Sequence, residues 1–351
     1  MAVKDKKPWR QTPLVESDTL SKAAGCRIFL KLENLQPSGS FKSRGIGNLL
    51  CTAMRRAQNP HNVHFFSTSG GNAALAAVHA ANFLGRPCSV VVPDTTKPFM
   101  VEKIRIAGAA EVVQFGAGLR EADAHLREVM MPLAEAAGAE CVYVPPFDHQ
   151  DIWDGHSTLM DELRVQFSEL GESAPEMIAC SVGGGGLMCG IVQGLDRLGG
   201  QWDDTQVLAV ETLGADSLAQ SLEAGELITL PNITSSAVTL GARRVAERTF
   251  ELASKYQAQG RLRHAVYTDA EAAMACCRFL DTERMLVELA CGVTLSLCYD
   301  GRLKQALGRP VHPDEKVVIV VCGGHSATSS VIEQWRVEAA ELERTQLVNG
   351  N

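Results

Sequence analysis

The chain has 351 residues, a formal net charge of -8 at pH 7 and 46% hydrophobic residues. Such a chain is long enough for about two globular domains with hydrophobic cores of their own. The excess of acidic residues argues against a broad nucleic-acid-binding surface and against binding to anionic membranes, because both need clustered Lys and Arg.

The N-terminal segment and the cysteines set expectations about the compartment. Residues 1–10 are rich in Lys and have no apolar run, so we expect no secretory signal. The most apolar window, 177–192, is too short and too rich in glycine to span a membrane. The 11 cysteines form no Cys-x-x-Cys pair, and we therefore expect free thiols and a cytoplasmic protein.

Short apolar runs alternate along the chain with longer segments of helical periodicity, which is typical of an α/β protein with mostly parallel sheets. We predict strands over residues 28–33, 63–66, 88–93, 111–115, 141–144, 177–181, 206–211, 264–268 and 316–321. We predict helices over residues 41–58, 72–84, 97–107, 119–138, 154–170, 187–198 and 270–283. After Val331 we expect a helix and then a polar, frayed end.

The pair Pro145 and Pro146 indicates where the chain passes between domains, since consecutive prolines stop a helix and stiffen a linker. The block that this pair closes contains about four compact β/α units. We therefore predict a small domain over residues 41–146 and a discontinuous large domain over residues 1–40 and 147–351.

The first informative motif is the turn Pro-Ser-Gly-Ser-Phe-Lys-Ser-Arg-Gly at 37–45, which leads into a predicted helix. Lys42 would lie in the first turn of that helix, beside its positive end. This position lowers the pKa of an amine and suits a lysine that forms a Schiff base. A solvated lysine at a helix start is the alternative interpretation.

The second motif, Ser-Thr-Ser-Gly-Gly-Asn-Ala at 67–73, follows a predicted strand and opens a helix. Open α/β sheets bind ligands at this end of their strands. The backbone amides of the loop can hold a carboxylate, and Asn72 offers a neutral amide to a ring oxygen. The alternative is an ordinary turn that is capped by Ser or Asn.

The third motif contains four consecutive glycines, in Ser-Val-Gly-Gly-Gly-Gly-Leu at 181–187. Such a loop lets backbone amides surround an anion at a helix N-terminus, and phosphate is the ligand that we expect. It is not a P-loop, since no Gly-Lys-Ser/Thr follows, and Met188 excludes the fingerprint G-x-G-x-x-G. A close-packed turn without a ligand is the alternative.

The fourth motif, Val-Val-Cys-Gly-Gly-His-Ser at 320–326, places Cys322 at the end of a predicted strand, where it would face a cleft. A buried structural cysteine is the alternative. His61 and His64 are close in sequence but have no matching acidic residues nearby. We therefore predict surface or packing roles for these histidines and no metal cluster.

The order of these four motifs resembles that of the fold-type II pyridoxal-phosphate enzymes, and most strongly that of the L-serine/L-threonine dehydratases, also called serine ammonia-lyases. The resemblance runs from about Thr12 to about Ser330 and includes residues 145–148, 153–156 and 211–215. It implies an α/β fold of two domains, similar to the tryptophan synthase β subunit, in which each domain has an open, mostly parallel sheet flanked by helices.

The resemblance also implies roles for particular residues. Lys42 and Ser69 would be catalytic, and Lys42 would form the Schiff base with pyridoxal 5'-phosphate. The rest of the cofactor would be held by Phe41, Asn72, Gly183, Gly184, Gly185, Gly186, Leu187 and Cys322. The carboxylate of an amino-acid substrate would be held by Ser38, Ser69, Gly70, Gly71 and Asn72.

The implied reaction is β-elimination from L-serine, with L-threonine as a second substrate, to give pyruvate or 2-oxobutanoate and ammonia. Lys42 would remove the α proton. A thiol at Cys322 is a weak, neutral partner for the pyridine nitrogen, which favours prompt elimination over a long-lived carbanion. The alternatives are elimination from cysteine, D-serine or a substituted 3-hydroxy amino acid, and a non-catalytic protein that binds the cofactor or an amino acid. The resemblance to this family also implies a homodimer.

Three positions depart from related enzymes. Racemases of this fold have a serine as second acid/base where this chain has Gly70, so we expect little racemisation. Ser43 stands where relatives often have an apolar residue or Asp. Leu289 replaces a proline, a change that can move the start of the helix expected at Ala290.

The resemblance further implies a monovalent-cation site that is made of a loop carboxylate and backbone carbonyls. The matching positions are Glu211, Ala215, Ser217, Leu240 and Ala242. Hard oxygen ligands suit K+, and Ser217 in place of a second carboxylate favours a singly charged ion. Glu211 as a solvated loop carboxylate is the alternative.

Overall fold

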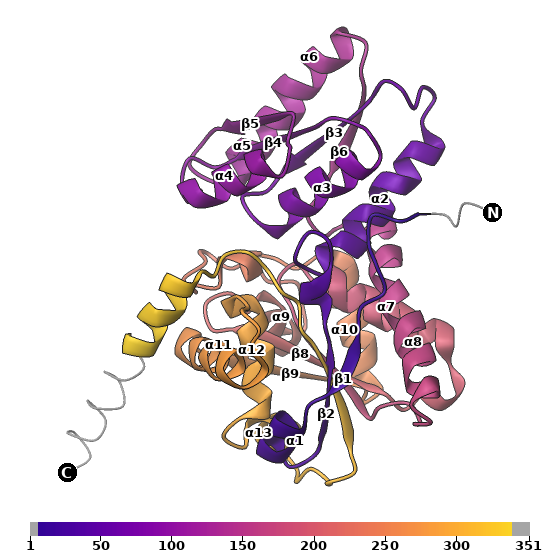
Figure 1. Ribbon diagram of the computed structural model, residues 1–351, viewed down its shortest axis with the longest axis vertical. Helices are drawn as coiled ribbons and strands as arrows, with labels where there is room; N and C mark the ends of the chain where they lie inside the picture. Colours follow the sequence, from indigo (N-terminus) through magenta and orange to yellow (C-terminus); the bar gives the residue numbers. More distant parts are fainter. Residues whose placement is uncertain (1–5, 339–351) are drawn as a thin grey trace.

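The computed structural model describes residues 6–338, which form two separate β-sheets flanked by helices (Figure 1). The six-stranded sheet contains β1 (Leu14–Glu16), β2 (Arg27–Lys31), β7 (Met177–Ser181), β8 (Gln206–Thr212), β9 (Leu262–Tyr267) and β10 (Lys316–Val320). The four-stranded sheet contains β3 (Val63–Thr68), β4 (Cys88–Val92), β5 (Glu111–Gln114) and β6 (Glu140–Val144). The predicted α/β class with mostly parallel sheets is therefore confirmed.

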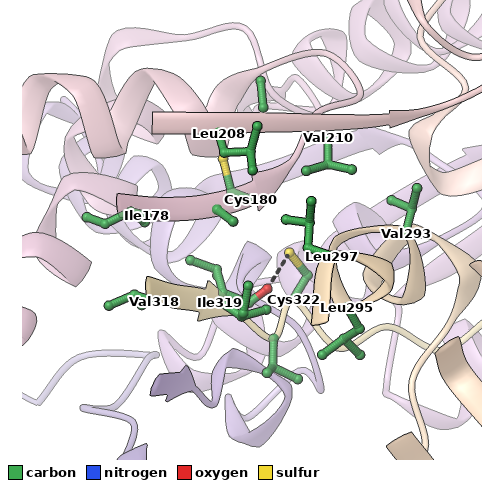
Figure 2. Packing of buried hydrophobic residues seen from close by; sticks show 14 of the residues in the cluster. Ile178, Cys180, Leu208, Val210, Val293, Leu295, Leu297, Val318, Ile319 and Cys322 are labelled. Atoms are coloured by element: carbon green, nitrogen blue, oxygen red, sulfur yellow. Dashed lines mark hydrogen bonds between the residues drawn. The ribbon is translucent and has the colours of Figure 1, made fainter. Parts of the chain in front are cut away.

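The larger sheet has the strand order β1-β2-β10-β7-β8-β9, and its paired strands are parallel except for β1 with β2. Strands β7 and β10 are buried along their whole length. Such continuous burial suits parallel strands that are covered by helices on both faces. Figure 2 shows Ile178, Leu208 and Val318 on neighbouring strands of this sheet; Val293 and Leu295 belong to the same buried cluster.

The smaller sheet has the strand order β5-β4-β3-β6, and all of its pairs are parallel. Its core contains Phe65 and Val90 from the strands together with Leu50 of α2 (Lys42–Arg56) and the alanines of α3 (Asn72–Phe83). Strand β3 leads into α3 through a short loop. This loop lies at the carboxyl edge of the sheet, where open α/β sheets bind ligands.

The remaining helices connect the strands or cover the two sheets. In the first half of the chain they are α1 (Asp18–Ala24), α4 (Pro98–Ile106), α5 (Leu119–His125), α6 (Met131–Ala136) and α7 (Gln150–Glu169). In the second half they are α8 (Gly186–Leu198), α9 (Ser217–Ala224), α10 (Glu247–Ala258), α11 (Asp269–Glu283), α12 (Leu289–Leu295) and α13 (Arg302–Leu307). A π-helical turn at Leu126–Met130 joins α5 to α6, and the described chain ends in helical residues 329–338.

Helices α2, α7 and α8 pack closely together because glycines lie at their contacts. A Cβ atom on Gly155 of α7 would lie 2.4 Å from the carbonyl oxygen of Arg44 in α2. A Cβ atom on Gly190 of α8 would lie 2.4 Å from His156 Cβ in α7. No side chain fits at either position without moving a helix. Helix α2, which carries Lys42, is thereby held against α7 and α8.

A buried ionic cluster holds the start of α2 from another side. The Arg44 guanidinium lies 2.7 Å from Glu33 Oε1 and 2.6 Å from Glu162 Oε1. Lys31 Nζ lies 2.7 Å from Glu162 Oε2. Because the two cations and two carboxylates contact one another, every charge in this low-dielectric cluster has a partner.

Every strand that the sequence predicts is present, with ends that differ by a few residues. The periodicity did not predict the antiparallel edge strand β1 or helices α1, α9, α10 and α13, and α12 was expected from the resemblance alone. Helices α1, α12 and α13 have only 7, 7 and 6 residues, too few for a clear period. The predicted domain boundaries at 41 and 146 stay a prediction. The polar end expected for the chain lies beyond residue 338, outside the described residues.

Candidate active site

Helix α2 begins at Lys42, so this lysine lies in the first turn. Its Nζ donates to the carbonyl oxygen of Pro146 at 2.5 Å and lies 5.2 Å from the centre of the Phe41 ring. Burial of the amine lowers the pKa of Lys42 from 10.5 to about 8, although part of the side chain stays accessible. An amine with this pKa is a competent nucleophile near neutral pH, unlike a solvated surface lysine.

The glycine loop at 183–187 joins β7 to α8 and is tightly packed on its outer side. A Cβ atom on Gly184 would lie 2.3 Å from the Phe147 ring. Gly185 has a φ of +92°, and a Cβ atom there would lie 2.1 Å from Thr249. Within the described residues, no backbone acceptor outside the helix takes the amides of 183–187. The loop therefore offers free donors at the start of α8, as an anion site requires.

The loop at 69–72 joins β3 to α3 at the carboxyl edge of the smaller sheet. The Gly71 amide donates to Ser69 Oγ at 3.2 Å. Gly71 is the N-cap residue of α3 and makes no side-chain hydrogen bond, so the turn is not the Ser or Asn cap of the alternative interpretation. A Cβ atom on Gly71 would lie 3.6 Å from Thr239 Cγ2. The loop therefore lies beside the body that is formed by the larger sheet and its helices.

Asn72 is the first residue of α3, and its side-chain amide is held on two sides. Its Nδ2 donates to Glu288 Oε1 at 2.8 Å, and its Oδ1 accepts from the His325 amide at 3.0 Å. A carboxamide has two N–H donors, so one donor is left for a ligand. This supports the predicted contact of Asn72 with a ring oxygen.

Cys322 follows β10 and lies next to two other parts of the site. Its Sγ is 3.3 Å from Ser181 Oγ, and its carbonyl oxygen accepts from the Phe41 amide at 3.1 Å. Figure 2 shows Cys322 among the residues of the larger core, near Leu297. Burial raises the pKa of the Cys322 thiol to about 11, so the thiol is neutral at physiological pH. Since a structural cysteine is buried too, its role toward the cofactor ring stays a prediction.

Ser38 and Ser43 support the turn that presents Lys42. The two hydroxyl oxygens are 2.7 Å apart, and the Ser38 amide donates to Ser43 Oγ at 3.1 Å. His325 Nε2 lies 3.0 Å from the Ser38 carbonyl oxygen. The unusual serine at position 43 therefore has a structural role here, while substrate binding by Ser38 stays a prediction.

Glu211 lies at the end of β8 and is fully buried, so the alternative of a solvated carboxylate is wrong. Its two oxygens accept the amides of Leu218 and Ala219 at 2.9 and 2.8 Å, at the start of α9. Burial raises the pKa of Glu211 to about 8. The carboxylate has no cationic side chain within 4.0 Å among residues 6–338, which leaves its charge uncompensated when it is ionised.

Three other residues of the predicted cation site are linked to one another by hydrogen bonds. Ser217 Oγ donates to the Ala242 carbonyl oxygen at 3.0 Å, and the Ala242 amide donates to the Leu240 carbonyl oxygen at 2.7 Å. Ala215 is buried in the loop that precedes α9. A Cβ atom on Gly183 would lie 3.0 Å from Leu240 Cα, so this cluster borders the glycine loop.

The sequence analysis did not single out several polar side chains of this region. Glu288 contacts Asn72, and His325 contacts both Asn72 and the Ser38 turn, while Thr96 occupies the space that a Cβ atom on Gly70 would need. The available signal for Glu288 was an acidic residue directly before an apolar helix. That helix, α12, begins at Leu289, one residue before the start expected at Ala290.

The family model described as pyridoxal-phosphate dependent enzyme matches residues 6–323. The chain belongs to this family. An L-serine dehydratase of Saccharomyces cerevisiae is 41% identical over 325 residues, which are 91% of this chain and 94% of the relative. An L-serine dehydratase/L-threonine deaminase of Bos taurus is 41% identical over 316 residues, which are 90% of each chain. The predicted resemblance is therefore confirmed.

Solved structures agree with this membership. The crystal structure of a fungal L-serine ammonia-lyase from Rhizomucor miehei matches with a TM-score of 0.82 and 32% identity, and the match covers 95% of this chain and 100% of that chain. The maize serine racemase structure matches with a TM-score of 0.77 and 24% identity over 96% of this chain and 94% of that chain. The second match bears on the fold alone.

The residues of this pyridoxal-phosphate enzyme fit the cofactor. The free amides of 183–187 suit the phosphate group, and the desolvated amine of Lys42 suits the aldehyde. The spare N–H of Asn72 and the neutral thiol of Cys322 suit the polar positions of the ring.

Two further findings concern partners and metals. Among the helices of residues 6–338, none combines the length and apolar character that a membrane span needs. Over the same residues, no group of three or more His, Cys, Asp and Glu side chains is arranged to hold a metal ion. All 11 cysteines carry free thiols.

Proposed function

We propose that this chain catalyses the β-elimination of L-serine to pyruvate and ammonia, with L-threonine as a second substrate that gives 2-oxobutanoate. One observation carries the proposal. Burial lowers the pKa of Lys42, at the start of α2, to about 8. The amide of the neighbouring Phe41 donates to the carbonyl oxygen of Cys322, whose thiol is neutral. The names of the relatives that are 41% identical over nine-tenths of the chain point to the same reaction.

The side chains divide the work of this reaction. Bound pyridoxal phosphate would supply the electron sink for the α-carbon. The amides of 183–187 bind its phosphate, and Asn72 binds its ring oxygen. The backbone at 69–72 binds the substrate carboxylate, with Ser69 and Ser38 beside it. The neutral amine of Lys42 takes the α proton, the β-hydroxyl leaves as water, and hydrolysis of the product enamine gives pyruvate and ammonia.

A substrate panel tests the proposal. Purified protein that is loaded with pyridoxal phosphate is given L-serine, L-threonine, D-serine and L-cysteine, and formation of keto acid is measured. We expect L-serine to have the highest kcat/KM. A higher kcat/KM for D-serine or L-cysteine would mean that elimination from that amino acid is the main activity instead. Absence of keto acid from every substrate would favour a non-catalytic binding protein.

Two lysine variants serve as a matched pair for this panel. Lys42→Ala should abolish turnover and the incorporation of cofactor by borohydride reduction, because the proposal assigns both tasks to the amine of Lys42. Lys22→Ala changes an exposed lysine of α1 and should leave both readouts unchanged. Turnover in Lys42→Ala at the unmutated rate would contradict the proposed role of the lysine.

We further propose that Glu211 and the carbonyl oxygens around it bind K+. The support is a buried carboxylate that has two amide donors but no cationic side chain within the described residues. Ser217 adds a hydroxyl instead of a second negative charge, which favours a singly charged ion. Activity in buffer with an organic cation, before and after addition of K+ or Mg2+, tests this assignment.

A homodimer in the cytoplasm completes the proposal. The resemblance to dehydratases supports the dimer, and 11 free thiols support a reducing compartment. Sedimentation equilibrium of the loaded protein measures the oligomer, and a monomer at micromolar concentration would overturn that part.

A further inference from the structure

Glu288 is a buried carboxylate whose two oxygens are surrounded by hydrogen-bond donors. The residue is 2% exposed and directly precedes α12. Oε1 accepts from Asn72 Nδ2 at 2.8 Å and from Thr239 Oγ1 at 2.6 Å. Oε2 accepts from the Ser326 amide at 3.0 Å and from Ser326 Oγ at 2.8 Å. An ionised carboxylate has about four acceptor sites, so these donors saturate it.

The donors come from separate parts of the chain. Asn72 begins α3 next to the smaller sheet. Ser326 follows β10 of the larger sheet, and Thr239 lies in the 3-10 turn Val238–Leu240 before α10. Glu288 therefore ties the candidate substrate loop to the larger body. The Glu288 carboxyl group is also packed closely against Gly324, because a Cβ atom on Gly324 would lie 2.0 Å from the Glu288 carboxyl carbon.

These contacts determine which way the Asn72 amide points. Its Oδ1 receives the His325 amide, which can only donate, and its Nδ2 faces Glu288, which can only accept when ionised. The reversed amide would place two donors together at His325 and two acceptors together at Glu288. Only one orientation therefore satisfies both neighbours, and it leaves one N–H of Asn72 free for a ligand.

We propose that Glu288 is a positioning residue that orients Asn72, so that the free N–H of Asn72 meets the ring oxygen of bound pyridoxal phosphate. This inference rests on the proposed function, because it assigns the ring oxygen to Asn72. Glu288 itself touches neither substrate nor cofactor. It acts through the side-chain amide of Asn72. It can orient that amide only while the smaller sheet and the larger sheet, each with its helices, stay in contact here.

Glu288→Gln tests the role with little change in shape. A glutamine replaces one acceptor oxygen by a donor, so either Asn72 or the Ser326 amide loses its partner. We expect the affinity of the variant for pyridoxal phosphate, measured by equilibrium dialysis, to be about 10-fold lower than that of the unmutated protein. This is the size of effect that the loss of a hydrogen bond to a charged group gives. We also expect a changed ratio of the near-ultraviolet and visible bands of the bound cofactor, and a lower kcat with little change in KM.

The decisive measurement is a double-mutant cycle for cofactor affinity with Asn72→Ala, Glu288→Gln and the double variant. If Glu288 acts through Asn72, the double variant binds the cofactor as Asn72→Ala does, and the two effects do not add. Additive losses would mean that Glu288 has only a structural role. Unchanged affinity and spectrum in Glu288→Gln would also overturn the inference.

Controls separate this inference from the proposed function. Glu283→Gln makes the same chemical change at a residue that contacts Ser17, the N-cap of α1, and it should behave as the unmutated protein. If Glu288→Gln does not fold, Glu288→Asp keeps the charge and should give an intermediate, non-additive loss of affinity.

An unmutated protein that binds the cofactor but forms no keto acid would refute the proposed reaction and leave the affinity cycle able to decide on Glu288. An unmutated protein that does not bind pyridoxal phosphate would refute both.

Discussion

A Cβ atom on Gly70 would lie 2.7 Å from Thr96 Oγ1 and 2.8 Å from Thr96 Cγ2. Thr96 therefore fills the space that a side chain at position 70 needs. We expect Gly70→Ser alone to lower elimination and to give little D-serine, because Thr96 or the loop must move. With Thr96→Ala added, the serine fits and can donate a proton on the face opposite Lys42. The double variant should raise D-serine formation about 10-fold or more, as judged by chiral chromatography.

Thr96→Ala alone is the control for this pair, and it should form pyruvate without added D-serine. Substantial D-serine from the unmutated protein would mean that another residue serves as second acid/base. A productive Gly70→Ser single variant would show that Thr96 moves aside at little cost.

The pKa of Lys42 predicts how attachment of the cofactor depends on pH. Burial lowers this pKa to about 8, so about one tenth of the amines are neutral at pH 7, against about 0.03% for an ordinary lysine. The rate of cofactor attachment to cofactor-free protein should rise about 10-fold per pH unit below pH 8 and level off above it. Stopped-flow absorbance measures this rate. A rise that continues to pH 10 would show that the amine is not desolvated.

The raised pKa of Glu211 predicts that K+ stabilises the protein more at high pH. Burial raises the pKa of Glu211 to about 8 in the folded protein, whereas an unfolded glutamate has an ordinary pKa of 4.5. Without the cation, folding stability should therefore fall as the pH rises between these values. K+ replaces the proton, so its effect on Tm should be larger at pH 8.5 than at pH 6. An equal effect at both pH values would place the ion elsewhere.

Arg44→Met tests the buried ionic cluster. The change leaves the Glu33 carboxylate without its cation in a fully buried place, while Glu162 keeps Lys31. We expect a loss of about 3–5 kcal/mol in the free energy of unfolding, measured with urea. Arg105→Met breaks an exposed pair with Glu102 and should cost less than about 1 kcal/mol. Similar losses in both variants would contradict a special role for the cluster.

The strands and the turns that carry the four motifs could be predicted because their signals are local. Apolar runs mark buried parallel strands, and consecutive glycines mark a close approach of backbone to a ligand. The contact of Asn72 with Glu288 joins residues that are 216 positions apart, and no local pattern reports it. The same holds for Thr96 beside Gly70 and for Arg44 with Glu162. Burial of Glu211 was also beyond a local pattern, since a glutamate at a strand end is more often solvated.

The hydrogen bond from Lys42 to Pro146 has a consequence for engineering. It joins the beginning of α2 to the end of the segment that follows β6, so the chain enters and leaves the smaller sheet at nearly one place. The stretch between these two points contains the 69–72 loop and Thr96, whereas the glycine loop and Cys322 lie outside it. A chimaera that takes this stretch from another relative keeps two covalent junctions in register. Such an exchange would transplant the groups that we propose to bind the amino acid while the proposed phosphate anchor stays native.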